Sequence, residues 1–322
     1  MKRDSVSIVV SAFNEEGNIE KLYTELTRQL KKLKLARYEI IFVDDGSTDK
    51  TYATCIALQQ KDPAVKIVHL MRNFGHEIAM TAGMDHAKEK AVIFMDADLQ
   101  HPPVYIAQMI TYWQAGTDII LTRRLENKAT SSFYDFCAKV FYWLLNRLSD
   151  TKIPEKTPDF RLIDRSYIDI LKRFKEHDRL FRGMLPLICS DKNTKVIDFI
   201  APERFSGTSK YNFRKSFALA FNSIVQFSTR PLRLSIYLGL LGALFAVGMG
   251  IYVVAEHFLL NKASTGYATI MATIVLLGAI QLIVLGILGE YIGKIHIEVK
   301  NRPLYAAVFL DPEKKKNAKK KN

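Results

Sequence analysis

The first 125 residues alternate short apolar runs with longer segments of helical periodicity. The apolar runs are rich in Val, Ile and Phe, which favours β-strands. They predict strands at residues 5–10, 39–43, 66–70, 91–95 and 119–122. Strands that alternate with helices are joined by right-handed crossovers, so the pattern predicts an α/β domain with a mostly parallel sheet.

The C-terminal third contains two much longer apolar runs. Residues 234–255 and 263–289 form stretches of 22 and 27 residues without a charge. A helix needs about 20 apolar residues to cross the hydrocarbon core of a bilayer, so both runs are long enough. Two buried core helices are the alternative, although core helices of this length seldom lack every charge. The short linker predicts a transmembrane hairpin with spans at about 233–257 and 265–291.

Two further stretches, at about 131–148 and 210–229, carry Phe-rich stripes at helical spacing. Such a stripe is a core-facing surface in most helices. The second stripe lies just before the first span and has basic residues at its start, which favours a helix in the membrane interface. The predicted organisation is an N-terminal domain over 1–229 that includes these two helices, a hairpin over 230–293 and a basic tail over 294–322.

Charge is distributed unevenly along the chain. The net charge is +13, and residues 201–322 hold 16 Lys and Arg against six Asp and Glu. Beside two predicted spans, this excess indicates anionic membrane lipids as partners rather than nucleic acid. Basic residues flank the outer ends of the hairpin at Arg230, Arg233, Lys294, Lys300 and Arg302. The positive-inside rule therefore predicts a two-span protein of the cell membrane, with both termini and the N-terminal domain in the cytoplasm.

Composition and missing motifs exclude several classes. The chain is 48% hydrophobic and 25% charged, which excludes wholesale disorder. Three scattered cysteines without a C-x-x-C pair exclude a disulfide scaffold, and the histidines lack a zinc-binding spacing. Neither G-x-G-x-x-G nor a P-loop occurs, which argues against a dehydrogenase or a P-loop nucleotidase.

Paired acids follow two of the predicted strands. Asp44 and Asp45 come after the second strand, and Asp96 and Asp98 come after the fourth. Ligands of such sheets bind beyond the carboxyl ends of the strands. Two acids in D-x-D spacing can point the same way and suit Mg²⁺ or Mn²⁺ bound together with a diphosphate. The competing interpretation of such a pattern is a turn or a helix cap.

Seven motifs in a characteristic order carry a family resemblance. They are SIVVSAFNEEGNI, VDDGSTD, RNFGHEIAMTAGMDHA, FMDADLQHPP, DFRLIDR, ERFSGTSKY and LGILGEYIGKIHIEVKNRPLY, from about residue 5 to 305. As a set they resemble the membrane-anchored polyprenyl-phosphate glycosyltransferases of glycosyltransferase family 2, which include bactoprenol glucosyltransferases and dolichol-phosphate mannose synthases. One departure is Ser11-Ala12-Phe13, where many members carry a proline before the aromatic residue.

The resemblance implies a Rossmann-like GT-A fold and inverting transfer of a sugar from a nucleotide-sugar to polyprenyl phosphate. The expected donor is UDP-glucose or UDP-N-acetylglucosamine, the acceptor undecaprenyl phosphate and the cofactor Mg²⁺ or Mn²⁺. The lipid-linked product would serve glycan or cell-envelope modification. A processive polysaccharide synthase is one alternative, but it usually carries a Q-x-x-R-W element that is absent here. A non-catalytic nucleotide-sugar binder is another, although such a relative would typically have lost some of the acids.

The resemblance also implies roles for individual residues. Residues expected to bind the nucleotide are Ala12, Phe13, Glu15, Asp44 and Asp96, and those expected to bind the metal are Asp96, Asp98 and Gln100. Asp159 matches the candidate catalytic acid. Residues that match diphosphate-binding or lipid-phosphate-binding positions are Arg123, Arg124, Arg204 and Lys210.

Some residues keep two interpretations. Asp159 acts either as a base or as an orienting group, because a phosphate monoester is mostly dianionic at pH 7 and hardly needs a base. Arg161 and Asp164 are candidates for a structural ion pair, and His76 has a core or loop role as an alternative to a functional one. Small residues spaced four apart in the second span are a weak sign of homo-oligomers.

Overall fold

The computed structural model describes residues 2–125, 157–177, 179–202, 230–260 and 266–311. The chain divides into two compact units. The first comprises Met1–Tyr142, Thr151–Asn212 and Pro303–Asn322, and the second comprises Trp143–Asp150 and Phe213–Arg302. The predicted interfacial helices at 131–148 and 210–229 lie outside the described residues, as do Arg204 and Lys210.

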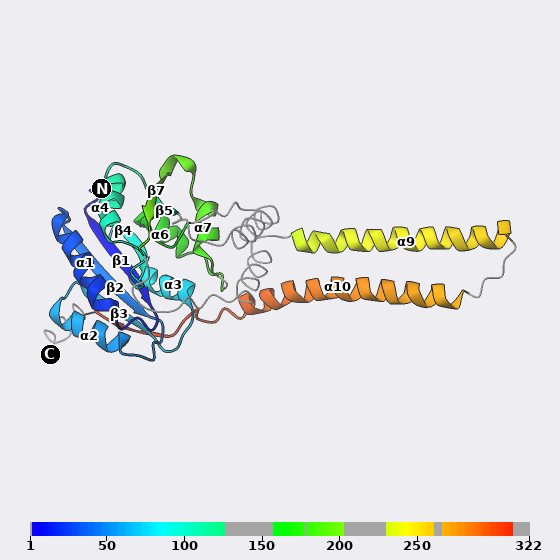
Figure 1. Ribbon diagram of the computed structural model, residues 1–322, viewed down its shortest axis with the longest axis horizontal. Coiled ribbons are helices and arrows are strands. Elements are labelled where there is room, and N and C mark those ends of the chain that lie inside the picture. The colour runs from blue at the N-terminus through cyan, green and yellow to red at the C-terminus, as the bar shows by residue number, and fades with distance from the viewer. Residues whose placement is uncertain (1, 126–156, 178, 203–229, 261–265, 312–322) are drawn as a thin grey trace. The chain divides into compact units, whose positions relative to one another are not determined.

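The first unit is built on an eight-stranded sheet with the order β7-β5-β6-β4-β1-β2-β3-β8 (Figure 1). The strands are β1 (Ser5–Ala12), β2 (Arg37–Asp44), β3 (Val65–Leu70), β4 (Ala91–Asp96), β5 (Ile119–Leu125), β6 (Arg161–Asp164), β7 (Thr194–Ile200) and β8 (Ala307–Leu310). Parallel pairing joins β1 to β2 and β4, β2 to β3, and β5 to β7. Antiparallel pairing joins β6 to β4 and β5, and β8 to β3. The five predicted strands and the mostly parallel sheet are confirmed.

Helices cover both faces of this sheet. The helices on one face are α1 (Ile19–Lys32), α2 (Thr51–Lys61) and α4 (Val104–Gln114), and those on the other are α3 (His76–His86), α6 (Arg165–Leu171) and α7 (Phe181–Ile188). Along β1, Ile8 and Val10 join the first core and Val9 joins the second. Successive side chains of a strand point to opposite faces, so a strand between two helical layers is apolar throughout. This explains the continuous apolar runs of the central strands.

The C-terminal strand β8 corrects the predicted basic tail. Residues 294–322 were expected to form a tail, but α10 continues to Val299 and β8 adds an edge strand to the sheet beside β3. Just after β8, the buried Asp311 lies 3.7 Å from Lys66 Nζ and 2.9 Å from Lys88 Nζ. A four-residue strand that pairs with a segment more than 200 residues away leaves no local pattern, because its partner is set by tertiary contacts.

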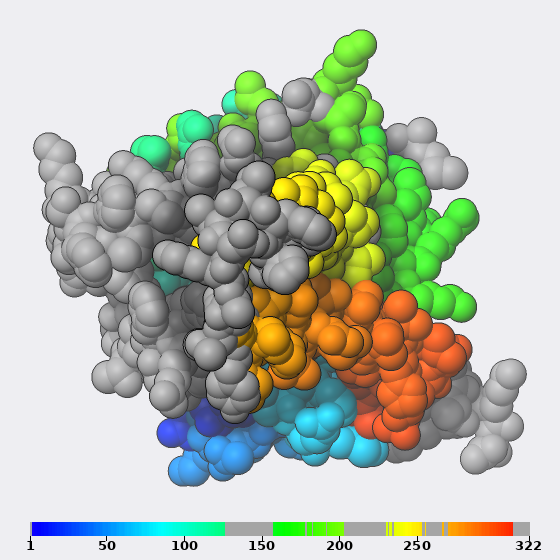
Figure 2. Space-filling model, turned by 90° about the vertical axis from the view of Figure 1, so that its right-hand side faces the viewer, coloured from blue at the N-terminus to red at the C-terminus, as the bar shows by residue number. Residues whose placement is uncertain are grey.

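The second unit is a hairpin of two long helices, α9 (Arg230–Leu260) and α10 (Tyr267–Val299). They lie side by side, coloured yellow and orange in Figure 1 and Figure 2. Among the described residues, the stretches apolar enough to cross a membrane are Ser235–Tyr252 and Ile270–Val299, of which only 11% and 0% are buried. The core helices of a soluble protein would be mostly buried, so exposed apolar helices of this length indicate membrane association.

Candidate active site

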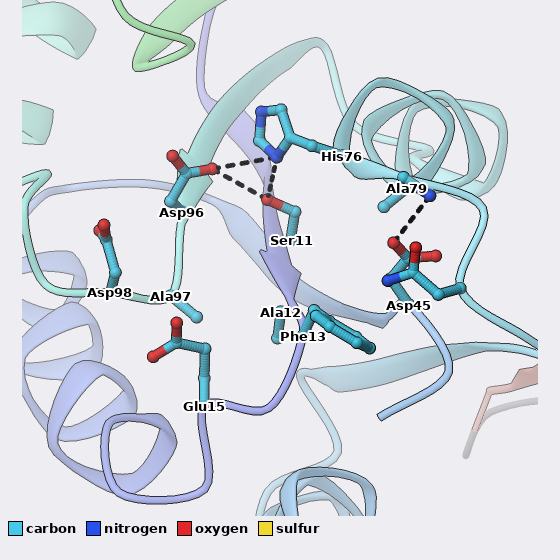
Figure 3. Close-up of a pocket in the computed structure, with 12 residues that line it drawn as sticks. Ser11, Ala12, Phe13, Glu15, Asp45, His76, Ala79, Asp96, Ala97 and Asp98 are labelled. Atoms are coloured by element: carbon cyan, nitrogen blue, oxygen red, sulfur yellow. Dashed lines mark hydrogen bonds and ion pairs between the residues drawn. The ribbon is translucent and has the colours of Figure 1, made fainter. Parts of the chain in front are cut away.

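A pocket of about 420 Å³ opens at the carboxyl ends of β1 and β4 (Figure 3). Its lining consists of Ser11, Ala12, Phe13, Glu15, Asp45, Asn73, Gly75, His76, Ala79, Asp96, Ala97 and Asp98. Five predicted site residues therefore come together here, namely Ala12, Phe13, Glu15, Asp96 and Asp98. The pocket lies where ligands of parallel sheets are expected.

The D-x-D acids stand at the end of β4. Asp96 Oδ1 accepts a hydrogen bond from Ser11 Oγ at 2.9 Å, and the backbone N–H of Asp96 donates to His101 Nδ1 at 3.0 Å. Leu99, which follows Asp98, has a φ of 62°, in the left-handed region that few non-glycine residues adopt. Strained backbone of this kind is concentrated at functional sites, where the surrounding structure holds it in place.

The chemistry of this edge fits a divalent cation. In Figure 3 the carboxylates of Asp96, Asp98 and Glu15 border the same open space. Mg²⁺ and Mn²⁺ prefer oxygen ligands, and Mg²⁺ commonly binds through one or two carboxylates together with substrate phosphates. Within the described part of the chain, no group of three or more His, Cys, Asp or Glu side chains is placed to hold a metal ion. Gln100 does not line the pocket, and its backbone N–H donates to Asp98 Oδ1 at 3.0 Å.

The loop before α3 is held against the end of β2. The carboxylate of Asp45 accepts hydrogen bonds from the backbone N–H groups of Phe74 and Gly75 at 2.7 and 2.9 Å. Burial raises the pKa of Asp45, and these hydrogen bonds offset only part of the rise. Gly75 has a φ of 97°, which glycine adopts without a steric penalty. The loop therefore sets the position of His76, the first residue of α3.

His76 connects several polar groups of the site. Its Nδ1 lies 3.4 Å from Asp96 Oδ1 and 3.1 Å from Ser11 Oγ, as Figure 3 shows. Its Nε2 lies 3.2 Å from Asp159 Oδ2. Burial lowers the pKa of the imidazole, but the charges of Asp96 and Asp159 outweigh that effect and raise the pKa to about 10. A protonated imidazole donates from both nitrogens, which suits a ring placed between Asp96 and Asp159.

Asp159, the candidate catalytic acid, is 3% exposed and precedes β6. One of its oxygens faces His76, and the other accepts a hydrogen bond from Arg161. The candidate ion pair between Arg161 and Asp164 is therefore wrong, because Asp164 instead accepts from Trp113 Nε1 at 2.7 Å. Positions 161 and 164 lie three residues apart within β6, so their side chains point to opposite faces of the sheet.

Asp44, which was expected to contact the nucleotide, is fully buried and does not line the pocket. His69 Nδ1 lies 2.7 Å from its Oδ2, and the backbone N–H of Ser47 donates to its Oδ1 at 3.2 Å. The ring of Tyr52 stacks on His69 with the centroids 4.0 Å apart. The neighbouring Asp45 lines the pocket instead, so a nucleotide contact by Asp44 stays a prediction.

Two of the residues expected to bind phosphate, Arg123 and Arg124, lie at the exposed end of β5, and neither lines the pocket. Arg123 donates through two nitrogens to the carboxylate of Asp198 on β7, at 2.7 and 3.0 Å. This ion pair raises the pKa of Arg123. Arg124 is exposed. Arg204 and Lys210 lie outside the described residues. The phosphate-binding role therefore stays a prediction for these two residues as well as for Arg123 and Arg124.

Four polar residues of the lining were not among the predicted site residues, namely Ser11, Asp45, Asn73 and His76. Ser11 directly precedes the predicted Ala12, Asp45 directly follows the predicted Asp44, and the other two belong to the RNFGHEIA segment. Their position within the family motifs is therefore the sequence signal that could have identified them as site residues. Nothing in the local pattern shows that these side chains meet in one pocket.

The fold and the pocket define a glycosyltransferase of the GT-A type. Residues 7–171 match the glycosyl transferase family 2 domain, and residues 230–295 match the GtrB C-terminal hairpin. The chain belongs to glycosyltransferase family 2. It is an enzyme of that family and carries a second, apolar module at its C-terminal side.

Curated relatives match nearly the whole chain. An uncharacterized glycosyltransferase of Synechocystis is 40% identical over 93% of both chains. The SfII prophage-derived bactoprenol glucosyl transferase of Shigella flexneri is 39% identical over 93% of this chain and 96% of the relative. Among solved structures, glucosyl-3-phosphoglycerate synthase from Mycobacterium tuberculosis is similar over 69% of this chain and 78% of its own, with a TM-score of 0.45 and 15% identity. So distant a similarity says nothing about ligands.

Proposed function

We propose that this enzyme transfers one sugar from a nucleotide-sugar to polyprenyl phosphate at the cytoplasmic face of the cell membrane. The observation that carries the proposal is the combination of a family 2 domain and a GtrB-type hairpin in one chain. The Shigella relative named as a bactoprenol glucosyl transferase matches over both parts. An acceptor embedded in the bilayer also accounts for two long apolar helices on an enzyme of sugar chemistry.

The pocket suits the nucleoside diphosphate of the donor. Phe13 is 37% exposed and offers an aromatic face to the base, with Ala12 and Glu15 beside it in the lining. Asp96 and Asp98 would hold Mg²⁺ or Mn²⁺, which when bound stabilises the negative charge of a departing diphosphate. UDP-glucose or UDP-N-acetylglucosamine is the expected donor, and the glucosyl transferases among the relatives favour glucose.

The transfer is a single displacement. An oxygen of the acceptor phosphate forms a bond to the anomeric carbon while the bond from that carbon to the diphosphate oxygen breaks. The bonding electron pair leaves with the nucleoside diphosphate. Because the nucleophile enters opposite the leaving group, the anomeric configuration inverts. A phosphate monoester has a second pKa of about 6, so the attacking oxygen carries no proton at pH 7 that a base must remove.

Basic residues complete the proposed phosphate sites. Arg124, Arg204 and Lys210 would meet the donor diphosphate or the lipid phosphate, since cationic donors form strong hydrogen bonds to phosphate oxygens. Arg123 would do so by exchanging the Asp198 carboxylate for phosphate. The basic residues that flank the hairpin support a cytoplasmic location of both termini beside anionic lipids. Homo-oligomer formation stays a prediction.

A transfer assay tests the proposed function. The full-length protein in detergent is mixed with undecaprenyl phosphate, Mn²⁺ or Mg²⁺, and one radiolabelled UDP- or GDP-sugar at a time. We expect one donor to give a chloroform-extractable product with a single sugar, and a chelator to abolish it. A long polymer would instead identify a processive synthase. No lipid-linked product with any donor would contradict the proposed acceptor.

A further inference from the structure

The ring of His76 contacts two carboxylates that belong to different strands. Asp96 ends β4, whereas Asp159 precedes β6, and His76 begins the helix α3. We propose that His76 is a positioning residue that holds the carboxylates of Asp96 and Asp159 in a fixed relation at the reaction centre. This inference rests on the proposed function, because it assigns the ring a part in sugar transfer.

The two nitrogens of the ring serve different partners. Nδ1 lies 3.4 Å from Asp96 Oδ1 and 3.1 Å from Ser11 Oγ, whereas Nε2 lies 3.2 Å from Asp159 Oδ2. The nitrogens of an imidazole are distinct groups on one rigid ring, so a contact at one restricts the direction of the other. A single ring between Asp96 and Asp159 therefore restricts the orientation of both carboxylates.

His76 also links Asp159 to the pocket. Asp159 is 3% exposed and does not line the pocket, whereas His76 lines it with 38% of its side chain exposed. The second oxygen of Asp159 accepts a hydrogen bond from Arg161, so donors engage both oxygens of the carboxylate. A carboxylate held in this way is better placed to orient its neighbours than to take a proton. The geometry thus favours the orienting interpretation of Asp159.

The backbone that carries His76 restricts the position of the ring. Gly75, directly before it, has a φ of 97°, and its N–H donates to the buried carboxylate of Asp45 at 2.9 Å. Within α3, a Cβ on Gly83 would clash with the side chain of Val9 on β1, so glycine allows the helix to lie close to the sheet. Close packing on one side and a fixed loop on the other leave the ring little freedom.

A double-mutant cycle tests whether His76 acts through Asp159. The variants His76→Ala, Asp159→Asn and the double variant are compared with the wild type in the transfer assay, and thermal unfolding confirms that each is folded. We expect His76→Ala to lower kcat about 10- to 100-fold, as removal of an outer-shell partner does. The loss should fall on kcat more than on the donor KM, because the ring is proposed to act by positioning the two carboxylates.

The cycle separates a positioning role from a merely structural one. If the ring acts through Asp159, the double variant loses much less than the product of the two single losses. Losses that multiply would overturn the proposal. His76→Gln keeps one N–H donor near the acids and should recover part of kcat. A Gln variant no faster than the Ala variant would contradict a role in hydrogen bonding.

His86→Ala is the matched control for helix α3. His86 lies at the opposite end of the helix, where its ring packs against Phe309 of β8 with the centroids 4.3 Å apart. The His86→Ala variant removes the same kind of ring from the same helix, but at the end away from Asp96 and Asp159. Its kcat should therefore stay at the wild-type value. An equal loss in His86→Ala and His76→Ala would show that helix packing is responsible and would overturn the proposal.

A measurement without turnover keeps this inference separate from the proposed function. Histidine labelled with ¹⁵N gives ring N–H signals, and the His76 signals are those missing from His76→Gln. We expect Asp159→Asn to shift the Nε2 signal of His76 and to leave those of His86 unchanged. An unshifted His76 signal would overturn the proposal even in an active enzyme. Absence of lipid-linked product from the wild type would instead contradict only the proposed function.

Discussion

The two ends of the central strands carry two clusters of charged groups that differ in their access to solvent. The amino-end cluster comprises Ser7, Glu39, Lys66, Lys88 and Asp311, and the carboxyl-end cluster comprises Ser11, His76, Asp96, Asp159 and Arg161. In the first, the side chains of Glu39, Lys66 and Asp311 are 3%, 5% and 0% exposed, and that of Lys88, at the surface, is 50% exposed. In the second, those of His76 and Asp96 are 38% and 32% exposed and face the pocket.

The charge balance of the two clusters differs as well. At the amino end, two lysines match two carboxylates within the cluster. At the carboxyl end, the pocket lining adds Glu15, Asp45 and Asp98, and it contains no Lys or Arg among the described residues. In a buried and balanced cluster, loss of one partner leaves an uncompensated charge, so each member matters for stability. An open cluster with excess negative charge is suited to a cation and therefore to function.

The largest expected effect comes from removing one acid of the open site. Asp98→Ala should lower metal-dependent transfer about 10³-fold or more while the protein stays folded, because the cation that stabilises the leaving diphosphate loses a ligand. The measurement is turnover against Mn²⁺ concentration, together with thermal unfolding. Asp169→Ala, which removes a 59%-exposed carboxylate from α6, is the control and should leave both unchanged. Undiminished metal-dependent turnover in Asp98→Ala would rule out the metal assignment.

A buried lysine of the closed cluster should control stability instead. Lys66→Met keeps the apolar stem but leaves Glu39 facing Asp311 without the ammonium group between them. Removing one partner of a buried ion pair costs about 3–5 kcal/mol, so the free energy of unfolding should fall by about that amount. Urea unfolding followed by tryptophan fluorescence measures the loss. The double variant Lys66→Met, Glu39→Gln also removes the unpaired charge, so it should recover part of the lost free energy of unfolding. If the single and the double variant lost equal amounts, the unpaired charge would not be the cause.

The two clusters also show what sequence patterns can and cannot reveal. Asp96 and Asp98 were predictable because a local apolar run ends directly before them. The partnership of His76 with Asp159 was not, since the two lie 83 positions apart and meet only through the sheet. Asp311 likewise reaches Lys66 only because β8 pairs with β3. Local periodicity predicts strands, whereas the contacts of short edge strands depend on tertiary structure.

The adjacent acids Asp44 and Asp45 show a second limit of prediction from sequence patterns. Asp44 and Asp45 follow the same apolar run, yet the first is fully buried against His69 and the second lines the pocket. Successive side chains of an extended segment point in opposite directions, so a difference of one residue decides which acid meets a ligand. The composition of a motif does not contain that information.

Acid should weaken the closed cluster through Glu39. Burial raises the pKa of this carboxyl, but hydrogen bonds from Lys66, Ser7 and the backbone of Lys88 outweigh it and hold the pKa below its usual 4.5. The unfolded chain therefore binds the proton more tightly than the folded one. The resulting stability is fully present above pH 4.5 and is lost as the pH falls through the lower folded pKa.

The matching experiment compares the wild type with Glu39→Gln in urea between about pH 6 and about pH 3. The difference in free energy of unfolding should shrink towards the acid end, because the wild-type carboxyl becomes neutral there as well. The effect is smaller than that of Lys66→Met, since the amide retains the shape and one acceptor oxygen. A difference that stays constant over this range would mean that Glu39 does not titrate with folding.

The smallest expected effects come from two serines on β1. Each contributes one hydroxyl group, Ser7 to the amino-end cluster and Ser11 to the carboxyl-end cluster. Ser7 Oγ donates to Glu39 at 2.5 Å in the closed cluster, and Ser11 Oγ donates to Asp96 at 2.9 Å in the open one. A typical hydrogen bond contributes about 1 kcal/mol net. Ser7→Ala should therefore lower the free energy of unfolding by about 1 kcal/mol and leave kcat unchanged. Ser11→Ala should lower kcat by about two- to tenfold with little loss of stability, because the pocket lets water replace the hydroxyl. If both variants lost stability equally and neither lost turnover, the two ends of the strand would be equivalent, and the division into a structural and a functional cluster would fail.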